Sequence, residues 1–363
     1  MVLLTLKDEG INMEEKLLNA SKHFNIKGNI ISIEPYGSGL INSTFIIKTD
    51  VKNYILQRIN NKLFVDVDGL MNNILLVTDY FHKKNPDKQC IHIIKTNDGE
   101  LYYKDDGNCF RVYHFVKNSY SMDVVDSADK FYLTARAFGE FVSNFYDFDA
   151  SKLVEVIPNF HNTEDRYRLF LEALENNKAN RKDEIKEEIK FITDRKDYAS
   201  RVLNLIRSGD IPLRVTHNDT KLNNILFDKD TNQPLAIIDL DTVMPGTVLY
   251  DIGDSLRFGT NATFEDDPNL DNVKFKIEYF EAYVKGYLEK YKPTKAEKDN
   301  IAFSAILLTY ECGMRFLTDY LNGDTYFRCT RKNHNLDRAR NQFKLIQEME
   351  KSLPEMEAIV NKY

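Results

Sequence analysis

The sequence has no tryptophan, few cysteines and no long run of apolar residues. Its 363 residues include 4 Cys, 20 Tyr and 23 Phe, so tyrosine and phenylalanine must supply the aromatic part of the core and of any binding pocket. No apolar run approaches the roughly 20 residues that a membrane span needs. The N-terminus also lacks a basic start followed by an apolar segment and a cleavage site of small residues. We therefore expect a cytoplasmic protein that does not enter a membrane.

An excess of positive charge is missing as well. The chain carries 49 Lys and Arg residues against 56 Asp and Glu residues, a formal net charge of −7. Nucleic acids and anionic membranes reward clustered Lys and Arg, so neither is expected as the main partner. At 363 residues the chain exceeds the usual size of one hydrophobic core, and about two domains or lobes are expected.

Closely spaced cysteine pairs, which are typical of zinc sites, are also missing. The four cysteines are Cys90, Cys109, Cys312 and Cys329. We expect them to be free thiols, two or more of them buried, rather than zinc ligands or disulfides.

What the sequence does contain is a distinctive polar loop. Residues 216–227 read Thr-His-Asn-Asp-Thr-Lys-Leu-Asn-Asn-Ile-Leu-Phe, and Asp239 follows a second apolar run. Transfer of a γ-phosphoryl group needs a carboxylate that orients the attacking hydroxyl and accepts its proton, and a cation near the phosphoryl group. Asp219 suits the base and Lys221 the cation. Asn224 and Asp239 offer an amide oxygen and a carboxylate, a suitable ligand pair for Mg²⁺.

The sequence on either side of this loop decides whether its residue spacing indicates a catalytic function or arose by chance. Asp and Asn are common in turns, so the spacing of Asp219 and Asn224 alone is a weak signal. Residues 212–216 are expected to form a strand before the loop, and residues 224–227 and 235–239 a hairpin after it. A catalytic loop and a metal-binding Asp on adjacent strands meet in space, which favours phosphoryl transfer.

The N-terminal part of the chain predicts a small sheet. Residues 12–25 have apolar positions at helical spacing, and residues 30–33, 43–48 and 54–58 are rich in β-forming residues. A glycine-containing hairpin between the first two strands lets backbone amides approach phosphate, although a plain hairpin turn is the alternative. The candidate phosphate-binding residues there are Gly37, Ser38 and Gly39.

The third expected strand carries Arg58 where protein kinases have a lysine that binds nucleotide phosphates. Arginine can bind phosphate bidentately but is not equivalent to lysine, and a solvent-facing Arg58 is the alternative. The helix expected over residues 67–84 contains no Glu to pair with it. Strands at 91–96 and 101–104 should flank the turn at 97–100.

The C-terminal part of the chain is mainly helical by its apolar spacing. A fifth strand at 109–116 should lead into a connector, and Ser127 should cap a long helix. Charged helices are expected within 162–208, and further helices at 272–290 and 295–320. Asp251 and Asp254, with Gly253, are expected to fix the loop over residues 242–257 that follows the hairpin and to cap the next helix, with substrate contact as the alternative.

The succession of glycine hairpin, catalytic loop and Ile-Asp-Leu-Asp strand resembles the aminoglycoside phosphotransferase and choline kinase superfamily over roughly residues 25–330. The resemblance implies an α+β, bilobal protein kinase-like fold. It implies a small antiparallel-sheet N-lobe over residues 1–115 and a larger, mainly helical C-lobe over residues 116–363. It also implies ATP and Mg²⁺ as cofactors.

Three stretches, residues 217–224, 239–247 and 315–324, are similar to bacterial N-acetylhexosamine 1-kinases, which phosphorylate the anomeric hydroxyl of N-acetylglucosamine or N-acetylgalactosamine. By this resemblance Arg315 and Tyr326 would contact the sugar. Together with Asp319 they offer the planar polar groups and aromatic face that a hydroxyl-rich ligand needs. An ion pair of Arg315 with Asp319, four residues apart on a helix, is the alternative.

Two positions depart from the pattern that is usual in the family. Asn218 stands where many relatives have Gly, and Arg58 where Lys is usual, but Asn tolerates the left-handed backbone better than most residues.

Two alternatives to a sugar kinase stay open. They are another small-molecule kinase, for aminoglycoside, choline or homoserine, and a nucleotide-binding scaffold without catalysis. We expect a monomer or weak homodimer whose partners are a small-molecule sugar and ATP.

Overall fold

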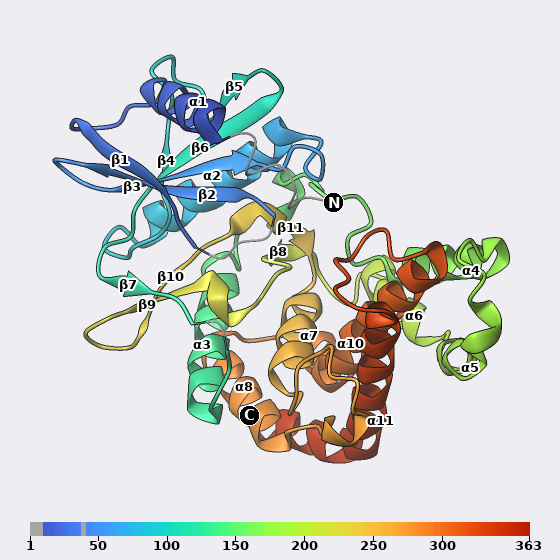
Figure 1. Cartoon of the computed structure of the whole chain (residues 1–363). Helices are drawn as coiled ribbons and strands as arrows, with labels where there is room; N and C mark the ends of the chain where they lie inside the picture. Colours follow the sequence, from blue (N-terminus) through green and yellow to red (C-terminus); the bar gives the residue numbers. More distant parts are fainter. Residues whose placement is uncertain (1–9, 38–40, 123) are drawn as a thin grey trace. The chain divides into compact units, whose positions relative to one another are not determined.

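The computed structural model describes residues 10–37, 41–122 and 124–363 (Figure 1). By its internal contacts the chain divides into two compact units. The first comprises Met1–Tyr120, Lys152–Ile157 and Leu226–Met244, and the second comprises Ser121–Ser151, Pro158–Ile225 and Pro245–Tyr363.

The first unit is built on an antiparallel sheet. Its strand order is β1-β2-β3-β6-β4, and β5 also pairs with β6. A smaller sheet in the order β10-β9-β7 accompanies it. The elements of the unit are α1 (Gly10–Lys22), β1 (Ile30–Pro35), β2 (Ser43–Thr49), β3 (Tyr54–Ile59), α2 (Val67–Lys84), β4 (Ile93–Ile94), β5 (Tyr103–Asp105), β6 (Asn108–His114), β7 (Ser119–Tyr120), β9 (Ile225–Asp228) and β10 (Pro234–Ile237).

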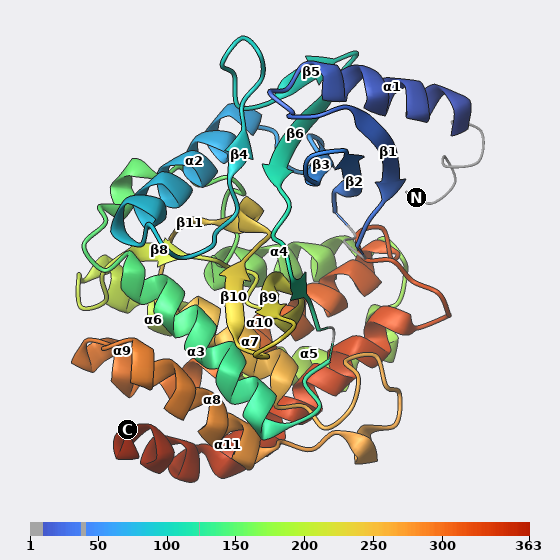
Figure 2. The ribbon, with the colours of Figure 1, turned by 90° about the vertical axis from the view of Figure 1, so that its left-hand side faces the viewer.

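The two faces of the larger sheet differ in chemistry because side chains alternate along a strand. One face carries Leu56 and Val112, which are cross-strand partners and pack with Leu17 of α1 into an apolar core. Figure 2 shows α1 beside the strands of this sheet. The opposite face carries Gln57 and Arg111, which are the next pair along β3 and β6. A buried arginine on a sheet face needs polar partners, so this face is the one to examine for function.

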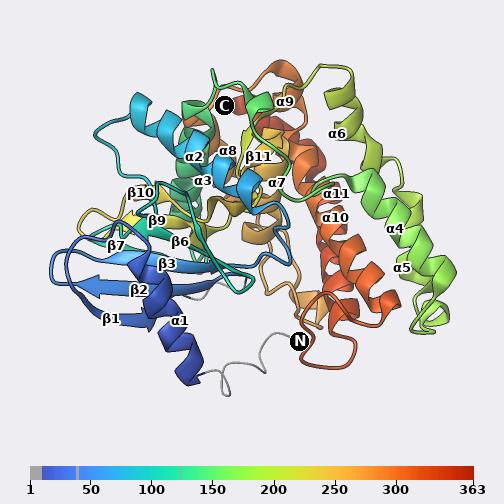
Figure 3. The same cartoon turned by 90° about the horizontal axis from the view of Figure 1, so that it is seen from above.

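The second unit is mainly helical. Its central helix α10 packs against α4, α7 and α11, and α3 packs against α8 (Figure 3). The elements are α3 (Ala128–Asn144), α4 (Thr163–Asn176), α5 (Lys186–Asp194), α6 (Tyr198–Arg207), β8 (Arg214–Thr216), β11 (Met244–Gly246, which starts at the last residue of the first unit), α7 (Val248–Gly259), α8 (Ile277–Lys290), α9 (Lys295–Asp299), α10 (Ile301–Asn322) and α11 (His334–Lys362).

Helix α10 is apolar on nearly all sides because it forms the core of this unit. Among the described residues it is the one helix long and apolar enough to cross a membrane by length and composition. However, 83% of its most apolar window is buried inside the fold. A core helix passes the same test, so its apolar character reflects packing against its neighbours.

The α+β class, with an antiparallel-sheet N-terminal region and a helical C-terminal part, is confirmed. The helix predicted over 67–84 has those bounds, and the side chain of Ser127 caps α3 by accepting from the amide of Lys130 at 3.3 Å. The single helix predicted over 295–320 is wrong. The chain forms α9 and then α10, with a break at Asn300, which is the C-cap of the first and the N-cap of the second.

The strands predicted at 91–96 and 101–104 also need correction. They are present only as the short β4 and β5, and each pairs with β6 rather than with the other. The turn between them is real, since Gly99 has φ of 91° and its amide donates to the carbonyl of Thr96 at 3.0 Å. Local turn chemistry was therefore predictable, whereas the partner strand was not.

Candidate active site

The catalytic loop follows β8 and ends in a short 3₁₀ turn, Leu222–Asn224, directly before β9. Lys221 Nζ lies 2.6 Å from Asp219 Oδ1. Asn224 Nδ2 donates to Asp219 Oδ2 at 3.0 Å and to the main-chain carbonyl of Asp219 at 2.8 Å. The structure thus brings together the three loop residues that the spacing singled out. Because the amide nitrogen of Asn224 is used in these bonds, its Oδ1 is the atom suited to a metal ion.

The charge state of Lys221 follows from its neighbours. Burial lowers the pKa of Lys221, but the carboxylates of Asp219 and Asp254 outweigh burial and raise the pKa above its usual value. The side chain therefore stays positively charged at neutral pH. A fixed cation beside a carboxylate is an arrangement that can stabilise a transferring phosphoryl group.

The buried carboxylate of Asp251 on α7 holds the loop in shape. Its Oδ1 accepts from the amide of Asn218 at 2.7 Å, and its Oδ2 accepts from the amide of His217 at 2.9 Å. Burial raises the pKa of Asp251 to about 7, while these two amide bonds act to lower it. Asn218 has a left-handed backbone with φ of 62°, as its tolerance for that region allows. The prediction that Asp251 and Asp254 fix a loop and cap the next helix is wrong, because both lie inside α7, whose N-cap is Thr247.

Helix α7 contacts the loop at two further points. Thr220 Oγ1 donates to the carbonyl of Asp251 at 2.6 Å, and Ser255 Oγ donates to the carbonyl of Thr220 at 2.6 Å. A Cβ on Gly246 would lie 2.4 Å from Thr216 Oγ1, so only glycine fits where the chain passes the start of the loop. Together these contacts tie the catalytic loop to the core of the second unit.

In the first unit, Asp239 follows β10 and precedes a 3₁₀ turn, Leu240–Thr242, in a left-handed conformation with φ of 58°. Two residues later, Asp241 forms a buried ion pair with Arg111, with Oδ1 and Nη2 2.5 Å apart. The other oxygen of Asp241 accepts from Asn42 Nδ2 at 2.6 Å, and Arg111 donates to Gln57 Oε1 at 2.8 Å.

This network explains how a charged arginine is tolerated inside the first unit. Burial lowers the pKa of Arg111, but the charge of Asp241, supported by that of Asp239, raises it overall. Sequence reasoning missed Arg111 and Asn42. An arginine in the run Cys-Phe-Arg-Val-Tyr, among apolar residues of a strand, is the signal that could have found the first of them.

The predicted nucleotide-binding residues lie elsewhere in this unit. Arg58 pairs across the sheet with Phe110, on the face opposite to that of Arg111, and its Nη2 lies 3.4 Å from Ser43 Oγ. Gly37 has φ of 78°, and a Cβ there would have no atom within 4 Å. Ser38 and Gly39 lie outside the described residues. The roles of these residues in nucleotide binding stay predictions.

The second unit contains a cavity of about 370 Å³ between α4, the C-terminal half of α10 and the segment after it. Its lining brings together the three predicted substrate residues with others that were not predicted. The residues used below are Arg166, Lys178, Arg315, Asp319, Tyr326 and Phe327. This volume lies at the lower end of the range of about 300–1,000 Å³ for small-molecule sites.

Asp319 shapes this cavity rather than offering its carboxylate to a ligand. Its Oδ1 accepts from the amides of Thr325 and Tyr326, and its Oδ2 from the amide of Phe327, each at 2.9 Å. Asn335 Nδ2 donates to Oδ2 as well, at 2.8 Å. These bonds hold the segment that carries Tyr326, whose side chain is 67% exposed.

The guanidinium of Arg315 lies over aromatic rings, 5.9 Å from the centre of Tyr326 and 5.5 Å from that of Phe327. Arg166 lines the same cavity from α4. Burial lowers the pKa of Arg166, and the positive charge of Arg315 lowers it further. Its Nε is buried and has no hydrogen-bond partner. Two guanidiniums that repel each other in one cavity favour a ligand rich in oxygen acceptors.

The positive charge of Arg257 acts on both Lys221 and Cys312. Lys221 lies in the field of Asp254 and Arg257, and Arg257 forms an ion pair with Asp254 at 3.0 Å. Burial raises the pKa of the Cys312 thiol to about 11, against the effects of Arg257 and Arg315. The charges of Arg257 and Arg315 therefore both act on Cys312 of α10.

Residues 32–296 match the sequence profile of the phosphotransferase enzyme family. The chain belongs to this family. The match covers the glycine hairpin, the catalytic loop and Asp239, the same motifs on which the resemblance rested. It does not extend to Arg315 or Tyr326, so the acceptor of this phosphotransferase is a separate question.

Solved structures agree on the fold. An aminoglycoside phosphotransferase from Alicyclobacillus acidocaldarius is 12% identical with a TM-score of 0.63, covering 95% of this chain and 96% of that one. A microcompartment-associated aminopropanol kinase is 14% identical with a TM-score of 0.57, covering 95% and 98%. An amicoumacin kinase in complex with AMP-PNP and Ca²⁺ is 12% identical with a TM-score of 0.60, covering 93% and 95%. At these identities the likeness concerns the fold alone.

Proposed function

We propose that this phosphotransferase transfers the γ-phosphoryl group of ATP to the anomeric hydroxyl of an N-acetylhexosamine. The observation that carries the proposal is a shared location. The unit that holds Asp219, Lys221 and Asn224 also holds a polar cavity lined by Arg315 and Tyr326, the two positions that the resemblance to N-acetylhexosamine 1-kinases assigns to sugar. Arginine and tyrosine side chains suit a neutral ligand with many hydroxyls and one acetamide.

In this proposal Asp219 accepts a hydrogen bond from the acceptor hydroxyl and then takes its proton. The bond from that oxygen to the γ-phosphorus forms as the bond to the β–γ bridging oxygen breaks, and ADP leaves. The transition state is loose, so the proton is lost late and an ordinary carboxylate is basic enough. Lys221, held charged beside Asp219, stabilises the transferring group.

The donor set fits a magnesium ion. Asn224 Oδ1 and the carboxylate of Asp239 would hold it, and both are the hard oxygen donors that Mg²⁺ prefers. Asn224 directly precedes β9 and Asp239 follows its partner strand β10, so one hairpin joins the two ligands. When bound, Mg²⁺ neutralises charge on the phosphate oxygens. The similar amicoumacin kinase, in complex with AMP-PNP and Ca²⁺, supports a nucleotide and a divalent cation here.

Gly37, Ser38 and Gly39 remain the proposed cradle for the nucleotide phosphates, with Arg58 as the proposed cation. The ion pair of Arg111 with Asp241 gives the first unit a fixed buried charge pair, although α2 has no Glu. We assign Arg111 to positioning the turn that carries Asp239, because Asp241 lies in that turn.

A cationic acceptor, such as an amino alcohol or an aminoglycoside, is the alternative, since similar structures include kinases for such compounds. The cavity disfavours it. Its lining carries Arg166, Lys178 and Arg315 against two carboxylates, of which Glu172 forms an ion pair with Arg168 and Asp319 is occupied by backbone amides. The rings of Tyr326 and Phe327, which could bind an ammonium group, already face the Arg315 guanidinium.

An acceptor panel tests the proposal. ATP consumption is measured with N-acetylglucosamine, N-acetylgalactosamine, glucose, galactose, choline, homoserine and kanamycin. We expect turnover with one or both acetamido sugars, and turnover at least about 100-fold slower with Asp219→Asn prepared in parallel, which excludes a contaminating kinase. Turnover confined to choline, homoserine or kanamycin would overturn the sugar assignment and keep the catalytic loop. ATP binding without phosphorylation of any acceptor would favour a nucleotide-binding scaffold without catalysis.

A further inference from the structure

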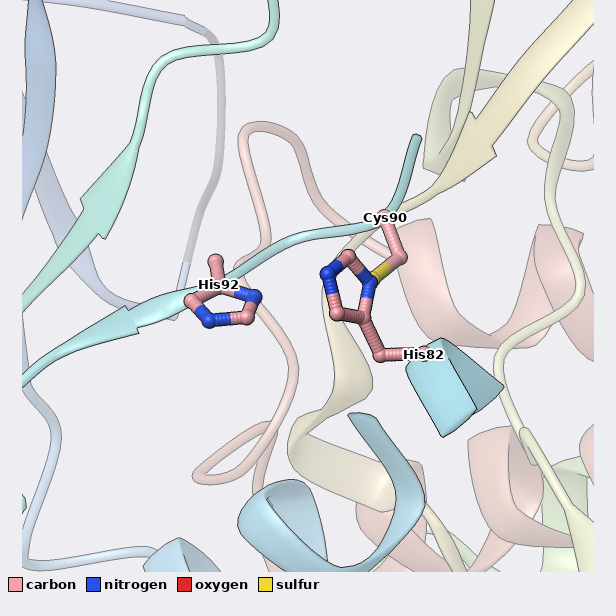
Figure 4. Close-up of side chains that lie close together, drawn as sticks. All are labelled: His82, Cys90 and His92. Atoms are coloured by element: carbon pink, nitrogen blue, oxygen red, sulfur yellow. The ribbon is translucent and has the colours of Figure 1, made fainter. Parts of the chain in front are cut away.

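One side-chain cluster of the first unit has no role in the proposed phosphoryl transfer. His82 lies in the last turn of α2, and Cys90 and His92 lie in the segment that leads into β4 (Figure 4). One ligand atom from each of the three side chains falls within 4.8 Å of the other two. Within the part of the chain that the structure describes, this is the only group of three His, Cys, Asp or Glu residues with such a spacing.

The distances match a metal site that is nearly closed. Cys90 Sγ lies 3.6 Å from His82 Nδ1, and the rings of His82 and His92 have their centres 4.9 Å apart. Bonds of about 2.0–2.1 Å to nitrogen and about 2.3 Å to sulfur at a tetrahedral ion place the ligand atoms about 3.3–3.6 Å apart. The thiol and the first imidazole already have this separation. The third donor, on His92, lies within 4.8 Å of the other two, so a change in its side-chain torsions brings it to the same separation.

The surroundings of the three side chains also suit a cation. Asp79 lies one helical turn before His82 on α2, and its negative charge acts on both Cys90 and His92. The amide of His114 on β6 donates to the carbonyl of His92 at 3.0 Å, which fixes the backbone there.

We propose that His82, Cys90 and His92 bind a zinc ion, with a water molecule completing the tetrahedron. Two imidazoles and a thiolate form the donor set of borderline-soft divalent metals, whereas Mg²⁺ and Ca²⁺ take oxygen. The site is therefore different in kind from the proposed magnesium site at Asn224 and Asp239. The ion joins the C-terminal end of α2 to the segment that enters the sheet, and it stabilises the folded chain by binding it.

Metal binding to the full chain, prepared without a histidine tag and freed of metal by a chelator, tests this site. Zinc is titrated against a chromophoric chelator, and Co²⁺ serves as a spectroscopic probe. We expect one zinc per chain and, with Co²⁺, a thiolate charge-transfer band in the near ultraviolet. We also expect the melting temperature to rise by a few degrees when free zinc exceeds Kd by about 100-fold. A chain that takes up no zinc at micromolar concentration overturns the proposal.

Variants locate the site. Cys90→Ser should abolish the charge-transfer band, and His82→Ala and His92→Gln should each weaken zinc binding at least tenfold. Cys329→Ser, which removes a partly buried thiol of the second unit, is the matched control and should bind zinc as the parent does. Circular dichroism confirms that each variant is folded. Zinc binding that survives Cys90→Ser and His82→Ala, or that Cys329→Ser abolishes, contradicts the assignment.

Discussion

At the scale of single residues, the proposed phosphoryl transfer depends on the carboxylate of Asp219. Asp219→Asn keeps the shape of the side chain but removes the proton acceptor, and general-base catalysis contributes about 10²–10⁴-fold. We expect kcat to fall by about that factor while nucleotide affinity, measured by calorimetry, stays unchanged. A variant that keeps more than a tenth of the parent turnover would show that Asp219 is not the base.

Arg315 provides the sharpest test of the acceptor site. Removing a charged hydrogen-bond donor costs about 1.5–3 kcal/mol, so Arg315→Ala should raise the KM for the sugar by about 10- to 100-fold. The KM for ATP should not change. Arg328→Ala, an exposed arginine of the same segment, is the control and should behave as the parent. If both variants alter sugar KM equally, the cavity is not the acceptor site.

Replacing Arg58 tests whether its side chain contacts the nucleotide phosphates or faces solvent. If Arg58 contacts the phosphates, Arg58→Ala should raise the KM for ATP about tenfold or more and leave the sugar KM unchanged. Its distance of 3.4 Å to Ser43 Oγ is a weak contact, so little stability should be lost. An unchanged KM for ATP would assign Arg58 to the surface, which is the alternative that the sequence left open.

Residue-scale prediction from sequence was strongest where chemistry fixes spacing along the chain. The positions of Asp219, Lys221 and Asn224 could be predicted because all three belong to one short loop. Arg111 and Asp241 could not, since they lie 130 positions apart and only the pairing of β3 with β6 and the turn after β10 brings them together. Arg166 was hidden in a charged helical stretch whose arginines look alike without a structure.

At the scale of elements, the catalytic loop depends on α7. Asp251→Ala leaves the amides of His217 and Asn218 buried and unpaired, at a cost of about 1–3 kcal/mol each. We expect a clear loss in melting temperature and a fall in kcat of at least tenfold, because Asp219 is the next residue in the loop. Asp251→Asn keeps one acceptor and should fall between the parent and Asp251→Ala in both measurements. Full activity in Asp251→Ala would show that the loop holds its shape without this anchor.

Helices were easier to predict than strand partners. The bounds of α2 follow from apolar residues at helical spacing and from a run of basic residues in its last turn. The break between α9 and α10 was missed, although Thr294 and Glu297 form a capping box that marks the start of the first. For β4 and β5 the turn signal was right, but the preference of both strands for β6 depends on long-range packing that a local pattern does not contain.

At the scale of the whole molecule, the family match and the candidate acceptor cavity cover different parts of the chain. The match over residues 32–296 includes the glycine hairpin, the catalytic loop and Asp239. The cavity is lined in part by α10 and the segment after it, which lie outside that match. The expectation for the cysteines depended only on the spacing between cysteines. It therefore missed His82 and His92, which lie close to Cys90.

The position of the phosphate on the product tests the central claim most directly. N-acetylglucosamine and N-acetylgalactosamine are each incubated with ATP, Mg²⁺ and the protein, and the reducing end of the product is assayed before and after phosphatase treatment. Phosphorylation of the anomeric hydroxyl predicts that the reducing end disappears in step with ATP consumption and returns on dephosphorylation. A phosphorylated sugar that keeps its reducing end would contradict the account, because another hydroxyl would then face Asp219.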